Sequence, residues 1–106
     1  MRRHNLYART YPALLAKTEI MYYVYVLQSE KNKEKLYIGT TDDLRRRLVE
    51  HNSSKNYSTK TDKPYRIVYY EVYLSKTDAL DRECKLKHHG SVIGHLKRRI
   101  KRSLSV

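Results

Sequence analysis

Residues 22–28 alternate aromatic and β-branched side chains, in the order Tyr-Tyr-Val-Tyr-Val-Leu-Gln. A period of two places Tyr23, Tyr25 and Leu27 on one face of an extended chain and Val24 and Val26 on the other. Because both faces are rich in residues that favour strands, the pattern predicts a central β-strand.

Two more strands are predicted beside this one. The polar residues 29–35 close a hairpin to a short strand over residues 36–39, which brings Tyr25 and Tyr37 to the same face. A third strand is predicted over residues 66–73. Strict alternation there sets Val68, Tyr70 and Val72 opposite to Ile67, Tyr69, Glu71 and Tyr73.

A charged amphipathic helix is predicted after Gly39, a residue that frees the backbone to turn. Asp42 and Asp43 fall in its first turn, where carboxylates favour the positive helix end, and Thr40 or Thr41 can cap the free amides. At about 100° per residue, one sector of this helix holds Leu44, Arg47, Leu48 and His51. An arginine and a histidine, four residues apart, therefore border its apolar stripe.

Two further helices are predicted. Ser75 with Asp78 forms a start that resembles a capping box, and the helix runs to about His88. Its apolar sector consists of Ala79, Leu80, Cys84 and Leu86, and Glu83 projects into the same sector. After Gly90, Ser91 can cap a last helix with Ile93, Leu96, Ile100 and Leu104 at helical spacing.

The pattern predicts an α+β fold, an α/β sandwich in which a small three-stranded antiparallel sheet is flanked by about three helices. A chain of 106 residues is one domain, expected over residues 21–103. Residues 1–20 have no clear period, and Met21 directly precedes the first strand. We expect this segment to be a disordered extension or the product of a start codon assigned too far upstream.

The net charge of the chain indicates what kind of partner it binds. Twenty-three Lys and Arg against eleven Asp and Glu give a net charge of +12, which is typical of a protein that binds a polyanion. No run of apolar residues approaches the length of a membrane span, so nucleic acid is the expected partner. The single Cys84 cannot form an internal disulfide, is expected in the core, and is consistent with the cytoplasm.

Three short motifs carry a resemblance to a known family. Tyr23-Val24-Tyr25 precedes Tyr37-Ile38-Gly39 by about a dozen residues, and Arg47 follows Tyr37 by ten. Residues 21–103 thus resemble the GIY-YIG nuclease superfamily, particularly its small stand-alone bacterial members and the N-terminal domain of the excision-repair nuclease. Tyr23 stands in place of the first glycine. Thr40 stands where some members carry lysine, so no catalytic lysine is assigned.

The resemblance implies adjacent antiparallel strands for the two tripeptides, an arginine and a histidine on the first helix, and a metal-binding glutamate on a later helix. The implied catalytic residues are Tyr25, Tyr37, Arg47, His51 and Glu83. Either tyrosine is the base, Arg47 holds the phosphate, His51 accepts a proton or binds phosphate, and Glu83 anchors one Mg²⁺ or Mn²⁺. A free tyrosine, with a pKa of about 10, is rarely ionised at neutral pH. Arg47 and the metal must therefore lower this pKa, or His51 must take the proton.

Glu83 has a second interpretation, because a carboxylate in an apolar sector is costly unless it is paired or bound to metal. A buried ion pair with a neighbouring Lys or Arg is the structural alternative to a metal ligand. The family match, in which an acidic residue follows an alanine by four, favours the metal ligand.

The predicted function is metal-dependent hydrolysis of DNA phosphodiester bonds, in DNA repair or recombination. The alternatives are a catalytically silent nucleic-acid-binding module and a basic structural protein of a ribonucleoprotein. The substrate structure and any protein partner for targeting stay open. Residues expected to contact nucleic acid are Lys55, Tyr57, Lys60 and Lys63 in a polar loop, and Lys97, Arg98 and Arg102 on the last helix.

Overall fold

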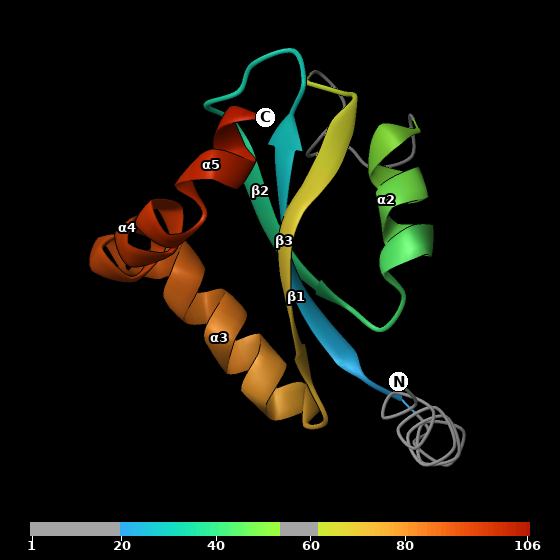
Figure 1. The fold of residues 1–106 in the computed structure, drawn as a ribbon. Helices are drawn as coiled ribbons and strands as arrows, with labels where there is room; N and C mark the ends of the chain where they lie inside the picture. The colour runs from blue at the N-terminus through green and yellow to red at the C-terminus, as the bar shows by residue number, and fades with distance from the viewer. Residues whose placement is uncertain (1–19, 54–61) are drawn as a thin grey trace, which may run out of the picture.

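The structure, a computed structural model, describes residues 20–53 and 62–106. The expected extension, apart from Ile20, and the loop residues Lys55, Tyr57 and Lys60 lie outside these ranges. Within them the chain forms an α+β fold, as predicted, with the elements shown in Figure 1. Their order is β1 (Tyr22–Ser29), β2 (Leu36–Thr41), α2 (Leu44–Asn52), β3 (Tyr65–Tyr73), α3 (Lys76–His88), α4 (Gly90–Arg99) and α5 (Lys101–Ser105).

The three strands form one antiparallel sheet in the order β2-β1-β3, so β1 is central as the sequence predicts. Tyr25 pairs with Gly39 of β2 and with Tyr70 of β3. Both faces of β1 are buried: Val24 and Val26 join one core cluster, whereas Tyr25 and Leu27 join another. As an edge strand, β2 leaves one side of its backbone without a neighbouring strand.

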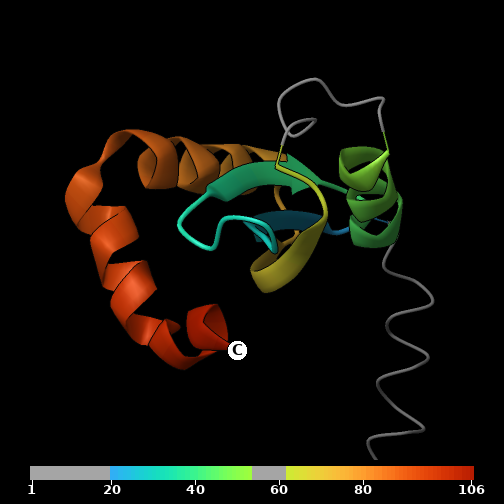
Figure 2. The same ribbon diagram turned by 90° about the horizontal axis from the view of Figure 1, so that it is seen from above.

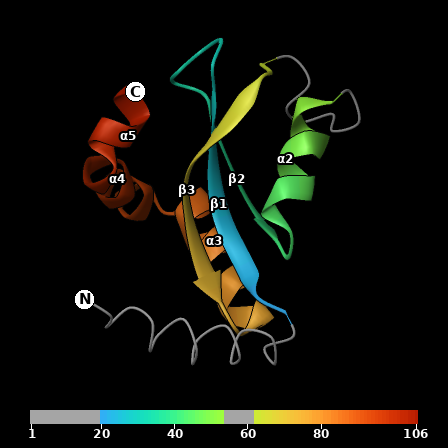
Figure 3. The ribbon, with the colours of Figure 1, turned by 45° about the vertical axis from the view of Figure 1, so that its right-hand side comes forward.

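Helices cover the two faces of the sheet unequally. Figures 1 and 3 show α2 on one side, with α3, α4 and α5 on the other. The view from above, Figure 2, shows α4 and α5 curving away from the end of α3. The larger core cluster, around Ala79, Leu86 and Leu96, lies on the side of α3–α5.

The alternation expected for β3 is wrong at its centre. Leu27 pairs with Ile67, but the preceding residue, Val26, pairs with Tyr69, so β3 contains an irregularity at Val68. Ile67 therefore packs with the α2-side cluster, whereas Val68 and Tyr69 both pack with the other one. A bulge adds one residue to one strand, and a strict period of two cannot represent it.

The helix starts were predicted with different accuracy. At α3, the Ser75 side chain accepts a hydrogen bond from the Asp78 amide, as expected. At α2, Asp43 is the cap and accepts from the Arg46 amide, while the Thr41 hydroxyl accepts from the Asp43 amide. Asp43 thus stands at the cap position, which was expected at Thr40 or Thr41, and not in the first turn.

The last helix is divided in two, because Ile100 leaves helical geometry between α4 and α5. Ser91 lies inside α4 and is not its cap. Leu96 and Ile100 are buried as their spacing predicts, and Ile93 and Leu104 pack beside them. On α3 the expected apolar sector is narrower, because Leu80 and Cys84 are exposed. Within the described ranges, no helix combines the length and apolar character that a membrane crossing requires.

Candidate active site

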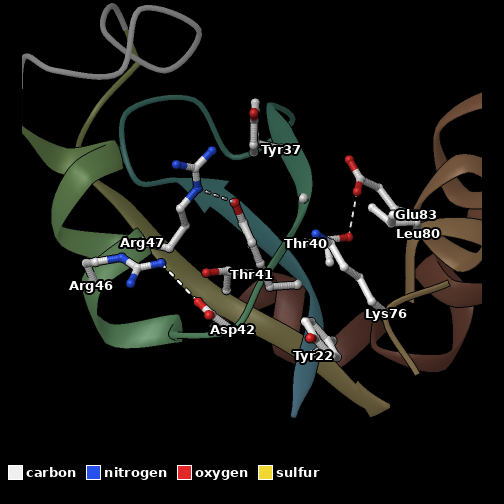
Figure 4. Close-up of a pocket in the computed structure, with 12 residues that line it drawn as sticks. Tyr22, Tyr37, Thr40, Thr41, Asp42, Arg46, Arg47, Lys76, Leu80 and Glu83 are labelled. Carbon is white, nitrogen blue, oxygen red and sulfur yellow. Dashed lines mark hydrogen bonds and ion pairs between the residues drawn. The ribbon is translucent and has the colours of Figure 1, made fainter. Parts of the chain in front are cut away.

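A pocket of about 430 Å³ lies at the outer edge of β2, between α2 and α3. Gly39, Thr40 and Thr41 of β2 form part of its wall. Figure 4 shows Arg46 and Arg47 on the α2 side and Leu80 and Glu83 on the α3 side. Tyr25 and Tyr37 also line it. The edge strand therefore brings residues from opposite layers of the fold to a single cavity.

Tyr25, His51 and Arg47 form a connected polar group on the α2 side. The Tyr25 hydroxyl lies 2.9 Å from Nε2 of His51, and Nε of Arg47 donates to the same hydroxyl at 3.3 Å. Because the guanidinium can only donate, the tyrosine oxygen accepts from Arg47, and its own proton can be donated to a neutral His51. Tyr25 is 1% exposed and His51 is 0% exposed.

Burial sets the charge states of this group. It raises the pKa of the Tyr25 phenol above 10, although the hydrogen bond and charge of Arg47 act in the opposite direction. Burial also lowers the pKa of His51 below 6.5, and the charge of Arg47 lowers it further. Desolvation outweighs the effect of Arg47 on the pKa of Tyr25. Arg47 alone therefore does not supply the lowered tyrosine pKa, which leaves the bound metal or transfer of the proton to His51 as the expected routes. A neutral phenol beside a neutral imidazole is the state expected at pH 7.

The burial of His51 favours one of its two expected roles. The His51 side chain has no exposed surface, so direct contact with a phosphate would require the site to rearrange. The role as a proton acceptor is compatible, because Nε2 faces the Tyr25 hydroxyl.

Tyr37 stands beside this group on the same face of the sheet. Its ring lies edge-on to His51, with centroids 4.6 Å apart, and is partly exposed. The ammonium of Lys87 lies 5.9 Å from the ring centroid, within the range of a cation–π contact. Tyr37 thus stands between the α2 and α3 sides of the pocket.

Gly39 has a steric reason to be glycine. A Cβ atom at this position would lie 2.6 Å from Cζ of Tyr25, well inside van der Waals contact. Its φ angle is not positive, so the glycine is not needed for the turn that the sequence suggested. It is needed because the ring of Tyr25 lies against the backbone of the neighbouring strand.

Glu83 faces the pocket from α3 and already has two partners. Thr40 donates its hydroxyl proton to Oε1 at 2.5 Å, and Nζ of Lys87 lies 2.6 Å from Oε2. The alternative of an ion pair with a neighbouring lysine is therefore present, but the pair is not buried, because the Glu83 and Lys87 side chains are 19% and 40% exposed. Lys87 lies outside the motifs that identified the candidate residues, although a lysine four residues after a glutamate on a helix signals such a pair.

The carboxylate oxygens in the pocket are suitable ligands for a hard divalent cation that the substrate also helps to hold. Each carboxylate oxygen of Glu83 retains a second lone pair, and the Asp42 carboxylate lines the same pocket. Among residues 20–53 and 62–106, no three His, Cys, Asp or Glu side chains cluster as a complete cage. Mg²⁺ commonly uses one or two carboxylates together with water and phosphate oxygens, so Glu83 fits that kind of site.

The three consecutive arginines differ in position. Arg47 is half-buried and has a second hydrogen bond, from Nη1 to Glu50 at 3.0 Å. Arg46 also lines the pocket, although its guanidinium pairs with Asp42 at 3.1 Å. Arg45 is exposed and does not line the pocket. Position on α2 thus separates Arg45 from the pocket, but not Arg46.

The basic residues of the last helix do not form one group. Lys97 lines a pocket with Tyr37 and Lys87, whereas Arg98 and Arg102 line a separate pocket formed by residues 98–103. Lys63 lies in the segment before β3 and does not line the pocket that holds Arg47 and Glu83. The assignment of these residues to nucleic-acid binding stays a prediction.

Similarity to known proteins places the chain in a nuclease family. The family model described as "GIY-YIG catalytic domain" matches residues 21–92, and the chain belongs to this family. The chain is 37% identical over 67 residues to UPF0213 protein SH2523 of Staphylococcus haemolyticus, covering 62% of this chain and 79% of that protein. It is 39% identical over 66 residues to a UPF0213 protein of Streptococcus pneumoniae serotype 4, covering 61% and 65%.

One similar solved structure is the solution NMR structure of UPF0213 protein BH0048 from Bacillus halodurans. Its sequence identity is 29%, with 77% of this chain and 86% of that chain covered, and the TM-score is 0.47.

Proposed function

We propose that this protein is a divalent-metal-dependent endonuclease that hydrolyses DNA phosphodiester bonds in DNA repair or recombination. The observation that carries the proposal is the pocket at β2, where Arg47, Tyr25 and Tyr37 face Glu83 across Gly39 and Thr40. These side chains supply the groups that phosphodiester hydrolysis needs: a cation for the phosphate, a route for the proton of water and a carboxylate for a metal ion.

Arg47 is proposed to hold the scissile phosphate. Its guanidinium has five N–H donors, and the bonds to Tyr25 and Glu50 use two of them. The same two bonds fix the plane of the group, so the charge is already oriented when the phosphorane develops. Preorganised donors of this kind account for a large share of many rate enhancements.

Tyr25 and His51 are proposed to move the proton. As the water oxygen forms its bond to phosphorus and the bond to the leaving oxygen breaks, the water proton passes to the Tyr25 oxygen. The original phenolic proton passes to Nε2 of His51, which lies 2.9 Å away. This relay needs no free phenolate, which agrees with the raised pKa of Tyr25. Tyr37, which is more exposed, is the other candidate for the first acceptor.

Glu83 is proposed to anchor one Mg²⁺ or Mn²⁺. When bound, the ion supplies neutralisation of the charge that develops on the phosphate and the leaving oxygen. The hydrogen bond from Thr40 orients the Glu83 carboxylate toward the pocket. The surplus of positive charge supports DNA as the partner, and the likeness to the excision-repair nuclease suggests repair or recombination as the setting.

One observation favours the binding-module alternative. The ion pair with Lys87 neutralises Glu83 without any metal, and a protein that only binds nucleic acid requires nothing more of this carboxylate. An endonuclease and a binding module would both bind nucleic acid, but only the endonuclease would cleave it.

The deciding experiment is a cleavage assay on linear, flapped, branched and damaged DNA and on RNA, each with Mg²⁺, with Mn²⁺ and with a chelator. Cleavage of at least one DNA substrate that depends on the metal is expected, with loss of cleavage in Arg47→Ala. Tight binding of every substrate with no cleavage in either metal would establish the binding module.

A further inference from the structure

A second pocket, of about 450 Å³, adjoins the proposed catalytic pocket along the edge of β2. We call it the β2-edge groove. It is lined by residues that include Lys35, Leu36 and Tyr37 at the start of β2, Lys87 of α3, and Ile93 and Lys97 of α4. The catalytic pocket occupies the other half of the same strand, and Tyr37 lines both cavities.

Lys87 is a second link between the two cavities. Its ammonium pairs with Glu83 in the catalytic pocket, while its side chain lines the groove. A β-strand of six residues extends about 20 Å, so the two cavities together exceed the space of a single phosphate group. A chain bound at Arg47 and Glu83 would continue along β2 into the groove.

The rim of the groove is positively charged. Lys35, Lys87 and Lys97 line it, together with one acidic residue, Glu34. Among the residues that the structure describes, Lys35 makes one long ion pair, 3.7 Å from Asp62. Lys97 is exposed and makes no ion pair within the part of the chain that the structure describes. Lys97 also lines a further pocket that reaches Gln28 and Leu104, so cationic surface extends beyond the groove.

The floor of the groove is apolar, which restricts the kind of nucleic acid that fits. Leu36, Ile38 and Ile93 are half-buried and line the cavity beside the buried Leu86. A duplex stacks the faces of its bases inside the helix and presents phosphates and base edges. An unpaired nucleotide exposes a base face, which can stack on the aromatic ring of Tyr37 at one end of the groove. The rest of the base can lie against the aliphatic floor, which removes apolar surface from water.

From this geometry we infer that the β2-edge groove binds unpaired nucleotides next to the scissile phosphate, with bases on the apolar floor and phosphates at Lys35 and Lys97. The substrate class is therefore nucleic acid with a single-stranded arm beside the cleavage point, not a continuous duplex. The position of the scissile phosphate rests on the proposed nuclease function. Binding of unpaired nucleotides in the groove can be tested separately, because it does not require cleavage.

Binding is measured in chelator, so that cleavage does not interfere, with a blunt DNA duplex and the same duplex carrying a single-stranded arm. The wild-type protein is expected to bind the armed duplex more tightly. Lys97→Glu is expected to reduce the affinity gained from the arm by about fivefold, the scale of one exposed charge contact reversed in sign. It should also lower the salt dependence of arm binding by about 0.7 in log–log slope, the value for one phosphate of a single strand.

The matched control is Lys101→Glu, an equal charge reversal on α5 at a residue that lines the separate pocket of residues 98–103. This variant should weaken both probes by the same factor, leaving the gain from the arm unchanged. A gain from the arm that is reduced equally in both variants, or unchanged in Lys97→Glu, would overturn the groove as the binding site.

Photocrosslinking tests the floor directly. An arm with a photoreactive base next to the duplex junction should crosslink to peptides from residues 35–38 or 93–97. Crosslinks confined to other segments would contradict the inference. If the arm binds in the groove but no substrate is cleaved with Mg²⁺ or Mn²⁺, the nuclease function fails while the groove stands; absence of binding to both probes overturns the two together.

Discussion

The Tyr25 hydroxyl lies 2.9 Å from Nε2 of His51, although the two residues are 26 positions apart. One belongs to the central strand and the other to the last turn of α2, so the contact joins two layers of the fold. Both side chains are buried, and the hydroxyl also accepts a hydrogen bond from Arg47. A buried polar contact of this kind orients every member of the group, and it underlies the first two predictions.

Replacement of the two tyrosines by phenylalanine should separate their roles. Tyr25→Phe removes the hydroxyl that connects water to His51, so kcat is expected to fall by about two to four orders of magnitude, the usual contribution of a positioned acid or base. Tyr37→Phe should have a much smaller effect. Single-turnover cleavage of one substrate by both variants measures this, and the reverse order would identify Tyr37 as the proton acceptor.

His51 should make stability depend on pH. Because its pKa is lowered in the folded state, the unfolded chain takes up the proton first as the pH falls below about 6.5, and this proton uptake favours unfolding. The melting temperature should therefore decline from pH 7 toward the folded-state pKa. In His51→Gln the decline between pH 6.5 and 5.5 should be weaker. Equal slopes in the two proteins would mean that other groups cause the dependence.

Arg47→Ala should lower turnover by about two or more orders of magnitude, because one preorganised donor at the phosphate is lost. Arg45→Ala is the matched control, since Arg45 carries the same charge on the same helix but is exposed and away from the pocket. It should cost only modest affinity. Equal losses in both variants that disappear at low salt would show that these arginines only hold DNA.

Glu83→Gln keeps the shape of the side chain but removes the anionic ligand. Metal-dependent cleavage should be lost while DNA binding in chelator is retained. Lys87→Gln breaks the same ion pair from the other side and leaves the carboxylate in place, so metal-dependent cleavage should persist. If Glu83 serves only the ion pair, the melting temperature should fall by the same amount in both variants. The cleavage activity of each should then follow its folded fraction.

Gly39→Ala should damage the site through packing alone. The new methyl group would meet the ring of Tyr25, so a loss of about 1–3 kcal/mol in the free energy of unfolding is expected, as for other overpacked positions. Gly94→Ala is the control: its nearest neighbour is a terminal guanidinium nitrogen of Arg98 at 3.8 Å, and alanine favours the helix. Denaturant unfolding of both variants measures the difference.

The sequence by itself determined the features that depend on local periodicity and capping. Alternation on residues 22–28 identified a strand with two buried faces, and Ser75 with Asp78 identified the start of α3. These patterns are readable because a strand or a helix repeats its side-chain directions every 2 or 3.6 residues. The motif spacing likewise identified the family that the matching model confirms.

Features that depend on where elements meet were decided only by the tertiary structure. The bulge at Val68 and the break at Ile100 interrupt patterns that the sequence continues. Leu80 and Cys84 are exposed although they fall in the apolar sector of α3, because a helical projection does not show which neighbouring elements cover each turn.

For the site, too, the sequence indicated the candidate residues, and the tertiary structure decided their contacts and charge states. The resemblance to the family selected the candidates Tyr25, Tyr37, Arg47, His51 and Glu83, but packing decided which of them touch. Desolvation raises the pKa of Tyr25 despite the adjacent arginine, and Lys87 occupies one side of Glu83. The electrostatic free energy of a side chain depends on every group and every water molecule around it. That environment is assembled only when β1, β2, α2 and α3 come together.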